Sequence, residues 1–346
     1  MEDKTLGWKT RWETALREQH QILFDPKTKS LKPEFAEFIN CPVCDSPKFK
    51  FLFEKDWFQY VRCTNCSMVY MNPRMNLAAT HSFYNSRVNA IYNETKFAQV
   101  SSVTSMDDRI NYDNLKLLDQ FRKHEKGVLL EIGSAKGFFL SKAKEMGYEM
   151  YGLELNNANY EYSRKLLGDT ILNVDLPDAR FDDGKFDVIY MRDVIEHIPN
   201  PKSFLHEVSR ITKPGGLIFL ETHNIESWIN KFARERHTVI FGFEHPNHWS
   251  PKTLGLVLSQ NGFVVQKVIQ ASLDFTLADM LNYMVIPSFT TIYPQPVSKV
   301  KRFMVKLLLI PYRFKIVPCL DRNTLPHIAN YFGGGSVMRV IAQKSA

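Results

Sequence analysis

The chain has 346 residues, of which 44% are hydrophobic and 13% aromatic. This length predicts about two folding units, and the composition excludes an intrinsically disordered chain. The formal net charge is +7, but residues 297–346 hold nine Lys or Arg and one acid, so the remainder is about neutral. That distribution argues against a nucleic-acid-binding surface spread over the whole fold.

The N-terminus is charged, beginning Met1-Glu2-Asp3-Lys4, and no apolar run follows it as in a secretory signal. The longest apolar run, residues 303–310, contains Lys306 and is too short to span a bilayer. We therefore expect a cytoplasmic protein.

Residues 1–40 are predicted to be a helical extension, with a surface helix over 8–21. Two cysteine pairs follow at Cys41/Cys44 and Cys63/Cys66, a spacing typical of zinc ribbons. Four thiolates close a tetrahedral shell, so this spacing predicts a structural zinc ion in a ribbon over residues 41–74. Residues 75–125 are expected to be largely helical.

A short apolar strand over 128–132 ends in a turn rich in small residues and is followed by helical spacing over 138–146. The next strand, 149–153, ends in Glu154. Turn glycines let backbone approach a ligand closely, and a carboxylate at Glu154 can accept both hydroxyls of a ribose. The stretch predicts a nucleoside-containing cofactor on a doubly wound parallel sheet.

The spacing of the turn selects the kind of cofactor. A dinucleotide site needs G-x-G-x-x-G, whereas this turn is Glu131-x-Gly133-x-Ala135-x-Gly137. An acid before the turn would repel a diphosphate but can organise a cationic amino-acid cofactor.

Three further strands are predicted, over 171–175, 186–191 and 217–222. Asp175 at the tip of the first could accept a hydrogen bond from an adenine amino group. Polar residues follow the second, which is apolar on both faces like a central parallel strand. Ligands bind outside the carboxyl ends of such strands.

The Glu131 turn, together with FDVIYMRDVIEHIPNPKSFLHEVSRITKPGGLIFLETHN, resembles the class I S-adenosylmethionine (SAM) methyltransferases over roughly residues 110–272. With the ribbon, the layout is similar to bacterial small-molecule and sugar methyltransferases. Many members have glycine at Ala135, and alanine is a mild departure. The resemblance implies cofactor contacts from Glu131, Gly133, Ala135, Gly137, Glu154, Leu155, Asp175, Leu176, Arg192 and Asp193.

The resemblance implies an α/β fold with a seven-stranded, mostly parallel sheet whose last strand is antiparallel. The SAM domain would run over 126–346, with an insertion at 273–332 before the last strand. Residues 75–125 would then be a lid over the cofactor, or a helical linker between domains.

Three histidines are candidate general bases: His197, His245 and His248. A sharper alternative is a second divalent metal ion at Asp193, Glu196, His197 and His248, as in some RNA-end and quinone-precursor methyltransferases, although those usually carry Glu at the position of Asp193. Such an ion would acidify a hydroxyl acceptor.

We expect a small or lipid-linked acceptor, with a sugar hydroxyl favoured over a carbon atom, in surface-polysaccharide or natural-product biosynthesis. One alternative is a nucleic-acid modifier whose ribbon grips RNA, but the ribbon's charges nearly balance. Another is an inactive SAM-binding partner.

Within the insertion, residues 299–315 combine helical apolar spacing with basic residues and no acid. This pattern is typical of an interfacial membrane helix and predicts a peripheral contact with the inner membrane face. A lid over the substrate pocket is the alternative.

Overall fold

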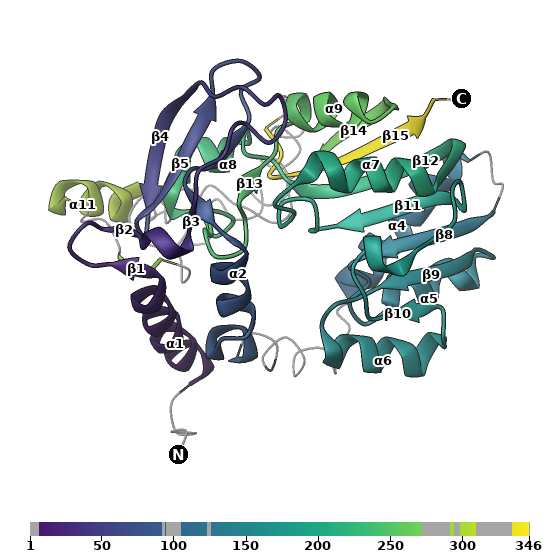
Figure 1. Cartoon of the computed structure of the whole chain (residues 1–346), viewed down its shortest axis with the longest axis horizontal. Coiled ribbons are helices and arrows are strands. Elements are labelled where there is room, and N and C mark those ends of the chain that lie inside the picture. Colours follow the sequence, from purple (N-terminus) through teal and green to yellow (C-terminus); the bar gives the residue numbers. More distant parts are fainter. Residues whose placement is uncertain are drawn as a thin grey trace. The chain divides into compact units, whose positions relative to one another are not determined.

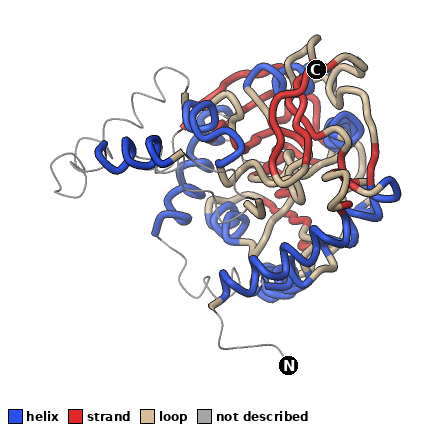
Figure 2. Tube along the Cα trace, turned by 90° about the vertical axis from the view of Figure 1, so that its left-hand side faces the viewer, coloured by secondary structure: helices blue, strands red, loops and turns tan. Residues whose placement is uncertain are grey.

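The computed structural model describes residues 7–91, 94, 105–122, 126–271, 291–293, 298–308 and 334–345. By its internal contacts the chain divides into two compact units, each built from several stretches of sequence. Unit 1 comprises residues 1–95, 223–253 and 270–338, and unit 2 comprises residues 96–222, 254–269 and 339–346. Figure 1 labels their helices and strands, and Figure 2 distinguishes helix, strand and loop along the trace.

Unit 2 is built on one sheet of seven strands in the order β10-β9-β8-β11-β12-β15-β14 (Figure 1). Its strands are β8 (Val128–Ile132), β9 (Glu149–Leu153), β10 (Ile171–Leu172), β11 (Phe186–Arg192), β12 (Thr212–His223), β14 (Phe263–Ala271) and β15 (Val337–Lys344). Its helices are α4 (Ser105–Phe121), α5 (Phe138–Glu145), α6 (Asn157–Leu167), η2 (Pro177–Ala179), α7 (Pro201–Ile211) and α9 (Pro251–Gln260).

The pairings from β10 to β12 are all parallel. β15 runs antiparallel to β12. Arg339 near the start of β15 bonds Glu221 near the end of β12, and Lys344 at the end of β15 bonds the Thr212 carbonyl at the start of β12. This confirms the predicted mostly parallel seven-stranded sheet with an antiparallel last strand.

One face of this sheet packs against α4, α5 and the end of α6. The buried cluster joins Leu115 and Leu118 of α4 to Phe139 of α5 and to Tyr190 of β11. The Phe139 and Tyr190 rings stack at 3.7 Å between centroids. Alternate side chains of each strand point to opposite faces, and both kinds are buried in β8 and β11. The apolar runs of the sequence therefore lie at the centre of the sheet.

Two local predictions differ from the structure. The strand predicted over 217–222 begins earlier, at Thr212, and residues 213–216 form a bulge within it, because Thr212 pairs with Phe186 and the next pair is Leu217 with Val188. The extra residues are held by a bond from Lys213 to the Asp187 carboxylate. The third strand, predicted over 171–175, is only Ile171–Leu172, since the Asn173 side chain turns back to the Glu154 carbonyl.

Unit 1 combines helices with a four-stranded sheet ordered β13-β6-β5-β4. Its strands are β1 (Phe24–Asp25), β2 (Ser30–Leu31), β3 (Ala36–Glu37), β4 (Phe49–Lys55), β5 (Phe58–Cys63), β6 (Val69–Met71), β7 (Arg74–Met75) and β13 (Asn247–His248). Its helices are α1 (Trp8–Leu23), η1 (Pro33–Phe35), α2 (Leu77–Tyr84), α8 (Trp228–Ala233), η3 (Arg234–Arg236) and α11 (Lys299–Leu308).

Two segments distant in sequence complete the core of unit 1. β13 pairs antiparallel with β6 of the ribbon. Residues 291–293 of the insertion attach to the β4–β5 turn, where the Asp56 carboxylate accepts the Ile292 and Tyr293 amides at 2.8 and 2.7 Å. Tyr293 also stacks on Trp57. The domain bounds predicted from sequence describe consecutive segments of the chain. Each compact unit combines several segments that are distant in sequence.

Among the described residues, no helix is both long and apolar enough to cross a membrane.

The Arg339–Glu221 bond holds the inserted last strand, and its loss is expected to destabilise unit 2. Glu221 is 4% exposed and accepts Arg339 Nε at 2.6 Å and the Asn114 amide at 3.2 Å. Arg339→Met leaves a buried carboxylate without its cation and should cost about 3–5 kcal/mol. Urea unfolding followed by fluorescence measures this loss.

The control is Arg164→Met, which breaks the exposed pair with Asp169 and should leave the unfolding midpoint close to that of the wild type, because solvent screens exposed ion pairs. Equal unfolding midpoints for the two variants would show that the Glu221 contact does not hold β15 in place.

Candidate functional site

The turn after β8 has a backbone that only small residues tolerate. Gly133 and Gly137 have φ of +77° and +76°, and Ala135 between them has φ of +46°. A Cβ atom on Gly133 would lie 2.7 Å from the Val194 Cγ2 atom. Within residues 133–137, called here the glycine turn, Gly133 and Ala135 are exposed at the carboxyl end of β8.

Ala135 is the departure from the family pattern, and the structure gives its physical consequence. Its φ lies in the left-handed region, which glycine adopts freely and alanine adopts at a cost of about 1 kcal/mol.

Glu154 is fixed against the glycine turn by two short hydrogen bonds. Its Oε2 accepts the Ala135 amide at 2.7 Å, and its Oε1 accepts the Asn156 amide at 2.6 Å. Burial raises the pKa of Glu154, and these backbone amides oppose that shift. Each carboxylate oxygen can accept more than one hydrogen bond, so the carboxylate retains capacity for the two ribose hydroxyls.

Glu131, the last residue but one of β8, has a buried carboxylate oxygen that is not satisfied by the protein residues described. Its side chain is buried, and its Oε2 has no hydrogen-bond partner among the described residues. Burial raises the pKa of Glu131 well above its usual value, although the Arg192 charge opposes this. A buried carboxylate without a partner costs free energy that a cationic ligand would remove. SAM, with its ammonium and sulfonium groups, fits this position.

The other predicted cofactor residues follow β9, β10 and β11. Arg192 ends β11 and donates to the Asn111 side chain at 3.1 Å, while Asp193 follows it with a φ of +53°. After β10, exposed Asp175 accepts the Leu176 amide. Leu176 is buried, whereas Leu155 after Glu154 is 65% exposed. Of these two leucines, Leu155 is therefore the one whose side chain is exposed enough to contact a ligand.

Unit 1 contains a second polar cluster, made of three histidines. Ring centroids lie 5.2 Å apart for His223 and His245, 5.3 Å for His223 and His248, and 6.4 Å for His245 and His248. His223 Nε2 and His248 Nδ1 are hydrogen-bonded at 3.1 Å. We call these residues the histidine triangle. The sequence analysis missed His223, although its position at the end of a parallel strand was a usable signal.

Within the histidine triangle, His245 and His248 have different environments. The Nδ1 of partly exposed His245 bonds the Val239 carbonyl at 2.8 Å. In the neutral ring this bond puts the proton on Nδ1, so Nε2 carries the lone pair that a general base needs. His248 is fully buried, and burial lowers its pKa well below the usual value. His248 therefore stays neutral at pH 7.

Two buried polar atoms beside the histidine triangle lack partners. In the described part of the chain, neither the His248 Nε2 nor the Tyr60 hydroxyl forms a hydrogen bond. The Tyr60 and His248 rings lie 5.3 Å apart. Unsatisfied buried polar atoms mark a place where a polar ligand or water binds.

His197, the third predicted base, lies in the turn after β11, where its amide bonds the Val194 carbonyl. It belongs to unit 2, whereas His245 and His248 belong to unit 1. The predicted second metal set of Asp193, Glu196, His197 and His248 is likewise divided between the units and stays a prediction.

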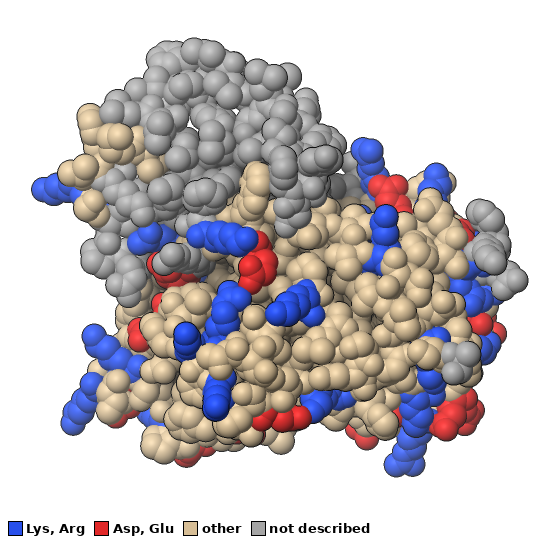
Figure 3. All heavy atoms as spheres, turned by 90° about the horizontal axis from the view of Figure 1, so that it is seen from above, with Lys and Arg blue, Asp and Glu red and all other residues tan. Residues whose placement is uncertain are grey.

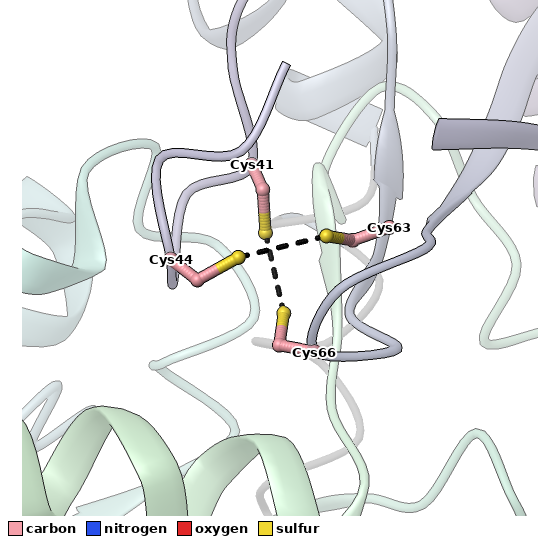
Figure 4. A group of neighbouring side chains, drawn as sticks. All are labelled: Cys41, Cys44, Cys63 and Cys66. Carbon is pink, nitrogen blue, oxygen red and sulfur yellow. Dashed lines mark hydrogen bonds between the residues drawn. The ribbon is translucent and has the colours of Figure 1, made fainter. Parts of the chain in front are cut away.

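The four ribbon cysteines point their thiols at one centre (Figure 4). The Sγ atoms of Cys41 and Cys66 lie 3.5 Å apart, those of Cys44 and Cys63 lie 3.6 Å apart, and all four fall within 4.8 Å of one another. A tetrahedral zinc ion with Zn–S bonds of about 2.3 Å separates its sulfur atoms by about 3.8 Å. The thiols fit zinc, which would close all four positions and act structurally.

The ribbon also positions the histidine triangle. Cys63 ends β5, Cys66 follows in the turn, and β6 begins at Val69, which pairs with His248 of β13. Tyr60 lies on β5 itself. Loss of the metal-bound turn would therefore loosen the strand on which His248 depends.

Comparison with known proteins agrees with this geometry. Residues 106–268 match the family described as "Methyltransferase domain". The chain is similar to ubiquinone biosynthesis O-methyltransferases of Erwinia tasmaniensis (25% identity over 32% of this chain and 51% of the relative) and Hydrogenovibrio crunogenus (23%, 48% and 73%). It thus spans about half the length of the former.

Among solved structures, it is similar to a SAM-dependent methyltransferase from Archaeoglobus fulgidus, with a TM-score of 0.44 and 19% identity over 68% of this chain and 93% of that one. Another, from Mesorhizobium loti, has a TM-score of 0.40 and 16% identity over 65% and 96%.

Residues 106–268 are therefore a methyltransferase domain of the class I, SAM-dependent type.

The buried Glu131 carboxylate predicts a pH-dependent affinity for SAM. A cationic ligand lowers the raised pKa of Glu131, so binding releases a proton and affinity should rise as the pH increases. Calorimetric titrations with SAM between pH 5 and 7 should show weaker binding at the acidic end.

Glu131→Gln is the matched variant, because it keeps the shape and removes the charge. It should weaken SAM binding by about 1.5–3 kcal/mol at pH 7 and flatten the pH dependence. A variant with the wild-type pH profile would exclude Glu131 as the titrating group.

The ribbon predicts about one zinc ion per purified chain, measurable by atomic absorption. Cys63→Ser should lose the zinc and destabilise unit 1, because metal binding is coupled to folding. It should leave α4 to α7 of unit 2 protected in hydrogen exchange. Zinc-free wild-type protein with four thiols that react rapidly in the native state would contradict the assignment.

Proposed function

We propose that the chain transfers a methyl group from SAM to a hydroxyl oxygen of a small or lipid-linked acceptor, and that the acceptor is a sugar. The observation that carries the proposal is the buried Glu131 carboxylate, whose Oε2 has no hydrogen-bond partner among the described residues, near the glycine turn. A site with a buried anion, an exposed backbone turn and a fixed second carboxylate suits a ligand with cationic and ribose groups.

Two observations support oxygen as the acceptor atom. The curated relatives are named as O-methyltransferases, and the histidine triangle supplies a basic nitrogen. A hydroxyl must lose its proton as it is methylated, and a positioned imidazole near neutral pH is suited to accept it.

The chemistry assigns separate tasks to the residues. Bound SAM supplies an electrophilic methyl group on sulfur, and in the transfer the S–CH3 bond breaks as the O–CH3 bond forms. His245 Nε2 accepts the hydroxyl proton, and the Nδ1 bond to the Val239 carbonyl holds that ring in the required tautomer. His223 and His248 position His245 rather than act on the acceptor, since His248 is buried and neutral.

A nucleic-acid substrate is the alternative from another class, and the charge pattern does not favour it. On the ribbon, Lys55 and Asp56 are buried, and Lys48, Lys50 and Arg62 remain against Asp45 and Glu54. On the face drawn in Figure 3, acidic side chains occur among the basic ones. An RNA grip needs a continuous basic patch.

An inactive SAM-binding partner is the remaining alternative, and the fixed Glu154 carboxylate and the shape of the glycine turn weigh against it.

The test is transfer of labelled methyl from SAM to a cell extract fractionated into nucleotide-sugars, lipids and RNA. The proposal expects label in the nucleotide-sugar or lipid fraction, on oxygen by mass spectrometry. Label in RNA, or on carbon, would overturn the acceptor assignment while leaving the methyltransferase activity intact.

The base assignment predicts that His245→Gln lowers kcat by about 10²–10⁴-fold while the Kd for SAM stays unchanged. His81→Gln, at an exposed histidine of the same unit, is the control and should match the wild type. Unaltered kcat in His245→Gln would remove His245 from the proton transfer.

A further inference from the structure

Helix α11 (Lys299–Leu308) exposes large apolar side chains to an unusual degree. Val300, Phe303 and Met304 are 73%, 61% and 51% exposed. With about 100° between successive residues of a helix, these side chains project within an arc of about 100°. They form one apolar face, which we call the α11 face.

The α11 face points away from the protein. Val305, on the far side of the helix, is only 3% exposed. Val305 is therefore covered, whereas the opposite side of the helix carries the exposed apolar groups. A core helix would have the reverse arrangement.

Basic side chains border the α11 face. Lys299, Arg302 and Lys306 are exposed and follow one another along the helix edge next to Phe303. Among the described residues, no carboxylate forms an ion pair with any of them. In the sequence, no acid occurs between Asp279 and Asp321. The helix thus presents three uncompensated cations beside an apolar stripe.

We propose that the α11 face docks the protein on an anionic lipid bilayer. The apolar side chains would enter the boundary between head groups and acyl chains, and the cations would contact lipid phosphates. Charge complementarity favours this occupant over a second copy of the chain, since two α11 faces would bring like charges together. The proposal does not rest on the proposed methyl transfer, because docking needs neither SAM nor turnover.

The experiment is co-sedimentation of the full-length, zinc-loaded chain with vesicles. Mixed phosphatidylglycerol–phosphatidylcholine vesicles should bind it at low salt, binding should fall in 0.5 M salt, and pure phosphatidylcholine vesicles should bind it weakly. Each cation near an anionic surface contributes about fivefold in affinity. The triple variant Lys299→Gln, Arg302→Gln and Lys306→Gln should therefore bind about a hundredfold more weakly.

A second variant separates insertion from simple charge attraction. Phe303→Ser with Met304→Ser keeps every cation, and it should lose binding if the α11 face enters the bilayer. The matched control replaces three other exposed lysines of unit 1, Lys9, Lys27 and Lys50, with glutamine. It removes the same charge and should retain most of the binding. Circular dichroism and zinc content verify the fold of each variant.

Three results would overturn the proposal. The wild type could remain in the supernatant with anionic vesicles at low salt, or the α11 variants could bind as well as the lysine control. The third result is that the wild type is a dimer and that the double variant Phe303→Ser with Met304→Ser is a monomer. The α11 face would then contact a second copy of the chain.

Discussion

The burial of one carboxylate, that of Glu131, is the constraint on which the cofactor site depends. It lies near the end of β8, between β9 and β11 in the sheet, and one of its oxygens has no partner in the described structure. A charge in that position is unfavourable unless a cation joins it. Two neighbouring features also favour cofactor binding. The glycine turn has positive φ at three of its residues, and Glu154 is fixed by two amides of the adjoining loops.

In unit 1 the ribbon supports the histidine triangle, because its sheet includes β13, the strand that carries His248. The pair Val69–His248 joins residues almost 180 positions apart, and the thiols that flank β5 and β6 stabilise the turn between them. A metal ion with no catalytic role could therefore influence catalysis through the histidine triangle.

Much of the sheet could be predicted from sequence because its strands are short apolar runs separated by glycine turns and helical spacing. The bounds of β9 were predicted to the residue, and the family resemblance supplied the antiparallel β15. The β12 bulge was not predictable, since it depends on the contact between Lys213 and Asp187 across strands. His223 directly follows the strand predicted over 217–222, but only folding brings its ring to His245 and His248, so the cluster itself could not be predicted from sequence. Residues 75–125, predicted to be a lid or a helical linker, lie partly outside the described residues, and most of the 273–332 insertion lies outside them.

The most direct test of this account is a calorimetric titration of the purified chain with SAM and, separately, with NADH. Glu131 should favour the cationic ligand and disfavour the diphosphate, so the account predicts one SAM bound per chain and no detectable NADH binding. Tight binding of NADH without binding of SAM would contradict it.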